Sequence, residues 1–151
     1  MRVGDVAVRQ PVTVSPDTTI EQAARAMAAD GVGCLVVTEG ETVVGIVTDR
    51  DLVVRGLADR VPPDARVDAV MTTHVVAMDV DSDVRDVIRT FGHHAVRRLP
   101  LVSGRHLVGI VTVDDLLVAM TDEIGLLTRG ITAQLLFPHA GDEPQRPVPV
   151  G

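Results

Sequence analysis

Aromatic residues and cysteine are nearly missing from this sequence: it has no tryptophan or tyrosine, two phenylalanines and one cysteine, Cys34. Proteins that stack nucleic-acid bases use aromatic side chains beside a basic surface, and the formal net charge of −7 disfavours phosphate backbones. A single cysteine excludes an intrachain disulfide and fits a reducing compartment. No run of about 18 apolar residues and no secretory leader are found. We therefore expect a cytoplasmic protein without nucleic-acid or membrane partners.

The most informative feature that is present is an internal duplication. A shift of 64 residues aligns the two halves without a gap, so that VGIVT at 44–48 recurs at 108–112 and the Asp-Leu pair at 51–52 recurs at 115–116. Positions that differ mostly stay apolar. One supersecondary unit therefore occurs twice in a chain long enough for one ordinary domain.

Each unit has the same predicted elements. Alternating or continuous apolar runs predict strands, and apolar residues three and four apart predict helices. The predicted strands are 12–14, 34–37 and 43–48 in the first unit, and 75–78, 99–102 and 107–111 in the second. The predicted helices start near Ile20 and span 49–57, 83–93 and 113–127. A related lead-in precedes each unit, at 3–6 and at 67–70. Gly130 is expected to end the last helix before a short apolar segment at 131–137 and a mobile tail.

These elements predict an α/β (α+β) fold of two tandem β-α-β-β-α repeats related by a pseudo-two-fold axis. A unit of about 60 residues leaves one face of its thin sheet wet, so we expect the two sheets to pack face to face with flanking helices. The predicted boundaries are 1–60 for the first repeat, 61–66 for a linker, 67–128 for the second repeat and 129–151 for the C-terminal segment.

The same motif ends the last strand of each repeat, as GIVTDRD at 45–51 and GIVTVDD at 109–115. Thr48 precedes a helix start, where backbone N–H groups favour an anion. Asp51, one turn later, is placed to accept both hydroxyls of a ribose. The alternative is that Thr48 and Asp51 only cap the helix. The two roles are compatible.

These two motifs, together with VRRLPLV at 96–102, resemble those of the CBS domain family over residues 3 to about 120. The resemblance implies a stand-alone Bateman-type pair that binds an adenine nucleotide, AMP or ATP above all, needs no cofactor and performs no chemistry. It also implies that adenine lies between backbone segments, 12–14 with 33–35 and 76–78 with 97–99. The predicted ligand-binding residues are Thr13, Gly33, Cys34, Leu35, Thr48, Arg50, Asp51, Ala77, Arg97, Arg98, Leu99, Thr112, Asp114 and Asp115.

Three arginines distinguish the two predicted clefts. Arg50 lies between the motif's threonine and aspartate in the first repeat, where the second repeat has an aspartate that would repel phosphate. Arg97 and Arg98 occur only in the second repeat. Because arginine binds phosphate oxygens bidentately, we expect these three side chains to set how many phosphates are tolerated. The alternative is that they form ion pairs with Asp49, Asp114 or Asp115.

The sequence favours a regulatory nucleotide-binding module over two alternatives. One is a ligand-free interaction or scaffold protein that uses the segment at 131–137. The other is a nucleotide-processing enzyme, for which no nucleophile elbow, P-loop, H-x-x-x-H or C-x-x-C pattern is found, so no catalytic or metal residue is predicted. Expected partners are a second copy, joined through the helices near 23–27 and 113–127, and an effector protein acting in trans.

Overall fold

Each repeat forms a short strand, a helix, a β-hairpin and a second helix. The computed structural model describes residues 1–136. The first repeat contains β1 (Thr13–Val14), α1 (Ile20–Asp30), β2 (Cys34–Glu39), β3 (Thr42–Thr48), α2 (Asp49–Asp51) and the π-helical turn η2 (Leu52–Leu57). The second contains β4 (Met78–Asp79), α3 (Val84–His94), β5 (Arg98–Ser103), β6 (His106–Thr112) and α4 (Val113–Leu136). The lead-ins form the 3-10 turns η1 (Val3–Asp5) and η3 (Val67–Ala69).

The duplication extends to the hydrogen-bond register. In the first hairpin Cys34 pairs with Thr48, and the ladder shifts after Val37. In the second hairpin Arg98 pairs with Thr112, and the ladder shifts after Leu101. All of these positions differ by the same 64 residues. The predicted tandem fold is therefore confirmed, and the two repeats share even the register shift in their hairpins.

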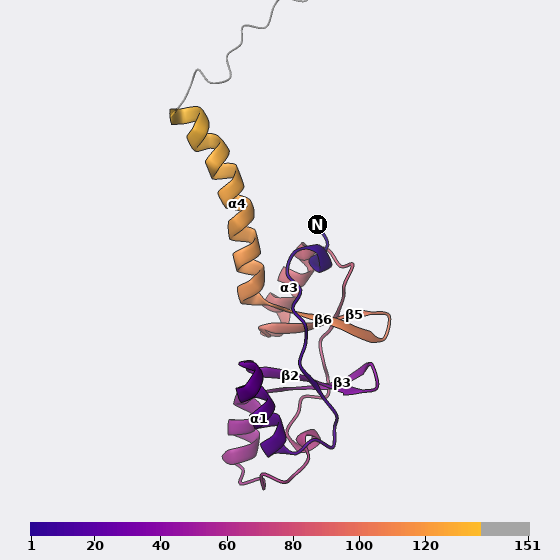
Figure 1. The fold of residues 1–151 in the computed structure, drawn as a ribbon. Helices are drawn as coiled ribbons and strands as arrows, with labels where there is room; N and C mark the ends of the chain where they lie inside the picture. Colours follow the sequence, from indigo (N-terminus) through magenta and orange to yellow (C-terminus); the bar gives the residue numbers. More distant parts are fainter. Residues whose placement is uncertain (137–151) are drawn as a thin grey trace, which may run out of the picture. The chain divides into compact units, whose positions relative to one another are not determined.

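The two hairpins face each other, as predicted (Figure 1). The strand order is β1-β2-β3-β6-β5-β4, and β3 and β6 meet at the single pair Thr42 and His106. Buried Cys34 and Val36 on β2 pack against Ile110 on β6. On the other face of β2, Leu35 and Val37 pack against α1. Each hairpin therefore has one face toward its own helix and one toward the other repeat.

The lead-ins cross between the repeats, which the sequence did not predict. Val67 is fully buried in the core of the first repeat, and its N–H donates to the Thr18 carbonyl at 2.7 Å. Reciprocally, the buried Val3 donates its N–H to the Ser82 carbonyl of the second repeat at 2.9 Å. Beyond each lead-in the chain continues along the other repeat's last strand. Each repeat is thus completed by the segment that precedes its partner.

Those crossing segments lie against the motif glycines. Arg9 exchanges backbone hydrogen bonds with Ile110, and Thr72 exchanges them with Ile46. A Cβ on Gly45 would collide with the Met71 side chain. A Cβ on Gly109 would collide with Val8, as Gly45 and Gly109 occupy equivalent positions. At both motif glycines, the space that a side chain would need is therefore filled by the crossing segment.

Two predicted boundaries are wrong. The strand expected at 75–78 is β4, Met78–Asp79, which pairs only with β5. Val75 and Val76 are β-branched but have no ladder partner: the residue of β5 equivalent to Val36, whose N–H donates to the Val12 carbonyl, is Pro100, which has no N–H. Gly130 does not end the last helix, since α4 continues to Leu136. A glycine costs a helix about 1 kcal/mol, which is far less than proline costs.

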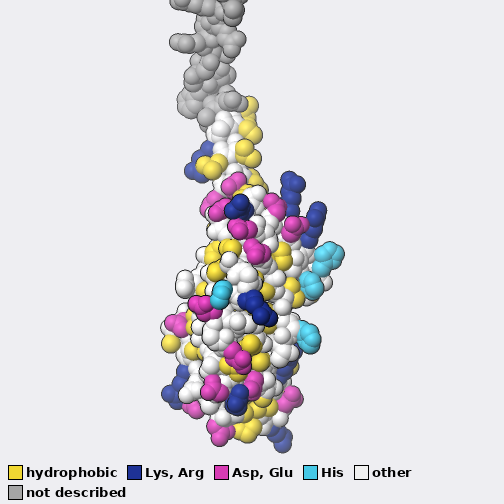
Figure 2. Space-filling view, turned by 90° about the vertical axis from the view of Figure 1, so that its right-hand side faces the viewer, with side chains coloured by type: hydrophobic (Ala, Val, Ile, Leu, Met, Phe, Trp, Pro, Cys, Tyr) yellow, Lys and Arg dark blue, Asp and Glu magenta, His cyan; other side chains and the backbone are white. Residues whose placement is uncertain are grey.

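Contacts divide the chain into a compact unit at Met1–Leu116 and a second unit that begins at Leu117. Within the second unit, the helix exposes many large apolar side chains, visible in Figure 2 as yellow patches next to the grey residues. They are Leu117, Val118, Met120, Ile124, Leu126, Leu127, Ile131 and Leu135. Phe137 and the predicted tail lie outside the described residues. No helix within residues 1–136 is long and apolar enough to cross a membrane.

Candidate functional site

Two cavities of similar size lie between the repeats, each built from both. We name them by the motif aspartate that lines each one. The Asp115 cleft has a volume of about 230 Å³, and the Asp51 cleft has about 220 Å³. Both are slightly smaller than the roughly 300 Å³ at the low end for the sites of drug-sized ligands. The predicted pair of equivalent clefts is present in the fold.

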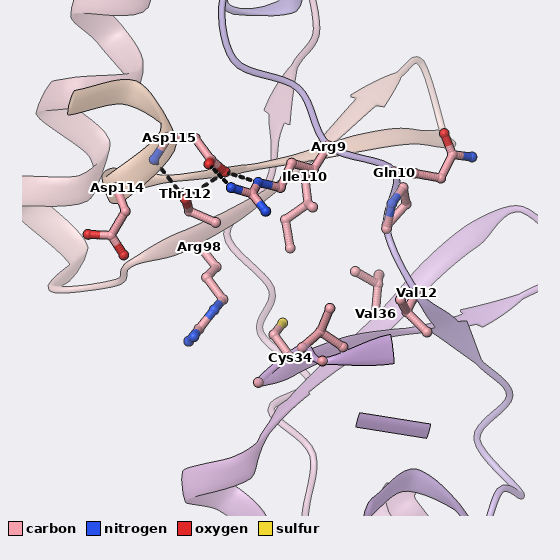
Figure 3. A pocket seen from close by; sticks show the side chains of 14 residues that line it. Arg9, Gln10, Val12, Cys34, Val36, Arg98, Ile110, Thr112, Asp114 and Asp115 are labelled. Carbon is pink, nitrogen blue, oxygen red and sulfur yellow. Dashed lines mark hydrogen bonds and ion pairs between the residues drawn. The ribbon is translucent and has the colours of Figure 1, made fainter. Parts of the chain in front are cut away.

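The Asp115 cleft has an apolar wall and a polar end. Cys34 and Val36 point from β2 toward Ile110 on β6, and Thr112 and Asp115 close the far side (Figure 3). Its lining residues are Arg9, Gln10, Pro11, Val12, Gly31, Val32, Gly33, Cys34, Val36, Arg98, Ile110, Thr112, Asp114 and Asp115. The backbone segments at 12 and 33–34 lie together here, as expected, but with the Thr-Asp motif of the opposite repeat.

The Asp115 carboxylate in this cleft is already engaged by other residues of the protein. Arg9 Nε donates to Asp115 Oδ2 at 2.7 Å, and Arg9 Nη2 bonds Oδ1. Thr112 Oγ1 donates to Oδ2 at 2.8 Å. The hydrogen bonds from Arg9 hold the pKa of the Asp115 carboxyl below its ordinary value, and partial burial opposes this. Asp115 is therefore a charged group whose two oxygens are both engaged.

The Asp51 cleft is more positive. Its lining residues are Ile46, Thr48, Asp51, Thr72, His74, Val75, Val76, Val96, Arg97 and Arg98. Asp51 Oδ2 accepts the Thr48 N–H at 2.9 Å, whereas Oδ1 has Arg55 Nε at 3.8 Å and no hydrogen bond from any residue between 1 and 136. One carboxylate faces two arginines here. Asp51 thus keeps an oxygen that can accept a ligand hydroxyl.

The helix start does not offer free donors, contrary to the prediction. Asp49 N–H donates to the Gly33 carbonyl at 3.0 Å, Arg50 N–H to the Asp49 carboxylate at 2.9 Å, and Asp51 N–H to Thr48 Oγ1 at 3.2 Å. Thr48 and Asp51 form a full capping box. The predicted capping is therefore confirmed at this helix start, and it uses only one of the two Asp51 oxygens. The anion site expected at these backbone N–H groups is therefore not available in the first repeat, because the Gly33 carbonyl, the Asp49 carboxylate and the Thr48 hydroxyl already accept from them.

The three predicted arginines have different surroundings. Arg97 Nη2 pairs with Asp114 Oδ1 at 3.2 Å, as the alternative proposed. Arg98 is half-buried, lines both clefts and has no ion pair within the described part of the chain. Arg50 is exposed and lines neither cleft. Arg98 is thus the guanidinium best placed for a ligand phosphate.

Four other predicted residues lie away from the cleft linings. Leu35 and Leu99 are fully buried. Ala77 lines neither cleft, and Thr13 lines a separate shallow hollow beside Thr38. Sequence reasoning missed Arg9, Thr72 and His74, among others. Only the recurrence of the lead-ins hinted that those segments matter.

Cys34 and the histidines show no sign of a reactive or metal centre. Burial raises the pKa of the Cys34 thiol to about 11, although the nearby Arg98 charge opposes this. His93 and His94 end α3, where a helix C-terminus favours positive charge. Among residues 1–136, no three His, Cys, Asp or Glu side chains converge as metal ligands would.

Paired repeats, crossed lead-ins and two equivalent inter-repeat clefts define a tandem ligand-binding module. The family model of the CBS domain matches residues 3–56 and 67–122. The chain is 37% identical over 116 residues to the CBS domain-containing protein YhcV of Bacillus subtilis, covering 77% of this chain and 83% of that protein. The chain belongs to the CBS domain family, and it is a CBS-pair regulatory module.

Solved structures give the same fold. An uncharacterized conserved protein from Pyrococcus horikoshii is 28% identical with a TM-score of 0.73, and the match covers 79% of this chain and 91% of that one. The CBS domain pair of protein MJ0100, solved in complex with 5′-methylthioadenosine and S-adenosyl-L-methionine, is 24% identical with a TM-score of 0.73. That match covers 82% of this chain and 98% of the other.

Proposed function

We propose that this module senses an adenine nucleotide, bound in the Asp51 cleft, and transmits the binding through its dimer or an effector protein. The observation that supports the proposal is the contrast between Asp51 and Asp115. Of these two aspartates, only Asp51 keeps a carboxylate oxygen without a hydrogen bond from residues 1–136, and its cavity also holds Arg98. An acceptor for a ribose hydroxyl and a donor for phosphate are the two polar groups that a nucleotide requires.

The apolar part of the same cleft suits adenine. Ile46, Val75, Val76 and Val96 give it aliphatic walls that a flat base can fill. The absence of ladder partners at Val75 and Val76 leaves their backbone groups available to the edge of the base. The bound adenosyl ligands of MJ0100 indicate that this fold has room for such groups.

Charge sets the expected phosphate preference. Arg98 is not paired within residues 1–136, but Arg97 must leave Asp114 before it can bind a second anionic group. Because both side chains of that ion pair are exposed, the pair contributes little to stability, and Arg97 can leave Asp114 for a phosphate at a small cost in free energy. We expect AMP to bind through Arg98 and ATP to recruit Arg97 as well.

Isothermal titration with AMP, ATP and adenosine tests the proposal. Asp51→Asn preserves the shape of the cap and removes the acceptor charge, so it is expected to weaken AMP binding at least tenfold. Asp115→Asn is the matched control at the equivalent position and is expected to leave AMP binding unchanged. Equal effects of the two variants, or no heat with wild type, would overturn the assignment. The second outcome would favour the ligand-free interaction protein.

A second variant separates the phosphate from the nucleoside. Arg98→Glu is expected to weaken AMP and ATP binding while adenosine, which has no phosphate, keeps its affinity. Unchanged affinity for every nucleotide would reject the phosphate role of Arg98.

Dimerisation is expected through helix faces, but not through α1. Ala23 and Met27 are buried in the core of their own repeat, so the predicted stripe near 23–27 is wrong as an interface. Val53 and Val54 on η2 are exposed, as are their equivalents Leu117 and Val118 on α4. Sedimentation of a Val54→Asp variant tests this: a monomer is expected, and an unchanged dimer would contradict the face.

The effector is expected to be a separate protein. A nucleotide that prefers one arrangement of the repeats shifts the population toward it by its differential affinity alone. The effector would be the protein whose affinity for the module changes with AMP. The cytoplasmic location stays a prediction.

A further inference from the structure

Arg9 lies inside the Asp115 cleft, although it belongs to the crossing segment that precedes the first repeat. Its two guanidinium contacts to Asp115 are bidentate, and its backbone exchanges hydrogen bonds with Ile110 at 2.9 and 3.0 Å. The backbone therefore holds the guanidinium next to the carboxylate. Asp115 is 14% exposed, whereas the Arg9 side chain is 70% exposed, so the arginine covers the acid from the solvent side.

The other cleft has no such group. Thr72 occupies the place of Arg9, because each is the residue that pairs with the strand carrying the motif glycine. Arg55 approaches Asp51, but from its own helix, and its Nη1 is directed to the Val70 carbonyl at 3.3 Å. Arg55 does not line the cleft. The two halves are therefore alike in fold, but an arginine binds the motif aspartate inside only one of the two clefts.

We propose that Arg9 is a built-in occupant that closes the Asp115 cleft to nucleotides, so that each chain binds one nucleotide and not two. This inference depends on the proposed function of the Asp51 cleft. A ribose entering the Asp115 cleft would replace two hydrogen bonds that are charged on both sides with two in which only the acceptor is charged, and these are weaker. Removal of the guanidinium is expected to raise the affinity of this cleft about tenfold or more.

Titration of AMP into four proteins tests the inference. Wild type is expected to bind one equivalent, and Arg9→Gln two. Arg2→Gln is the matched control, because Arg2 belongs to the same lead-in but pairs with Asp81 outside both clefts; it is expected to bind one. In Asp51→Asn/Arg9→Gln the remaining site is the opened Asp115 cleft, and one equivalent is again expected.

Each outcome bears on one of the two proposals or on both. One equivalent in wild type and still one in Arg9→Gln overturns the role of Arg9 and leaves the proposed function intact. Two equivalents in wild type do the same. No binding to wild type with one equivalent in Arg9→Gln supports the occupant and overturns the Asp51 site. No binding to any variant overturns both. Because the Arg9 side chain is mostly exposed, its replacement is expected to leave the fold unchanged, which circular dichroism checks.

Discussion

Replacement of Val67 by alanine tests whether the crossed lead-ins hold the two repeats together. Val67 precedes the second repeat in sequence but is fully buried in the core of the first. The change removes two carbon groups at about 0.8 kcal/mol each and leaves a cavity, so we expect a loss of about 2–3 kcal/mol in the free energy of unfolding. For a domain of this size that corresponds to a fall in Tm of roughly 8–12 °C.

Urea unfolding followed by circular dichroism measures the total loss, and hydrogen exchange locates it. We expect the slowest amides of the β2–β3 hairpin and of the β5–β6 hairpin to lose the same protection, because neither repeat is stable without the other's lead-in. Val108→Ala is the control: this valine is exposed and lies outside the proposed dimer face, and its truncation is expected to change stability by less than about 0.5 kcal/mol. Loss of protection confined to the β5–β6 hairpin would refute the reasoning.

Three further predictions concern single side chains. Because Asp115 has a lowered pKa, its ion pair stabilises the fold above the ordinary aspartate pKa of about 3.9 and ceases to do so as pH falls through the lower folded value. The excess stability of wild type over Asp115→Asn is therefore expected to be present at pH 7 and gone in strong acid. Urea titrations at several pH values would measure it. Cys34, with a pKa of about 11, is expected to resist a thiol reagent at pH 8 until urea unfolds the chain, and rapid labelling of the folded protein would contradict its burial. Thr19→Ala removes the α1 capping box and is expected to cost about 1 kcal/mol, whereas no loss by urea denaturation would mean that the cap contributes nothing.

The elements could be predicted from the sequence because apolar periodicity marks them directly. α1 begins at Ile20 as expected, since Thr19 and Gln22 supply a capping box and Gly31 adopts φ 63° at its end. β2 and β3 follow from their continuous apolar residues. The boundaries that failed, at Gly130 and at 75–78, depend on small energies or on pairing with distant residues, and neither is local information.

Many residues of the site could be predicted from the sequence, but not which segments of the two repeats meet in each cleft. The motif threonines and aspartates do lie at the clefts, because the strand-to-helix turn places them there. However, each cleft combines the motif of one repeat with backbone of the other, and Arg98 lies between both. The contact between Arg9 and Asp115 joins residues 106 positions apart. No local pattern encodes such a contact, since it results from how the lead-ins pass between the repeats.

The exchange of lead-ins has a consequence for how a chain like this originates by gene duplication. In a single unit, the valine of the lead-in would have no core to enter, and the core of that unit would lack the valine that fills it here. Two such chains could satisfy both by exchanging these segments, as the two repeats do within this chain. Joining two copies end to end would then need only a short connection before Val67. Each copy could afterwards change separately, as the bidentate contact of Arg9 with Asp115, which has no counterpart at Asp51, illustrates.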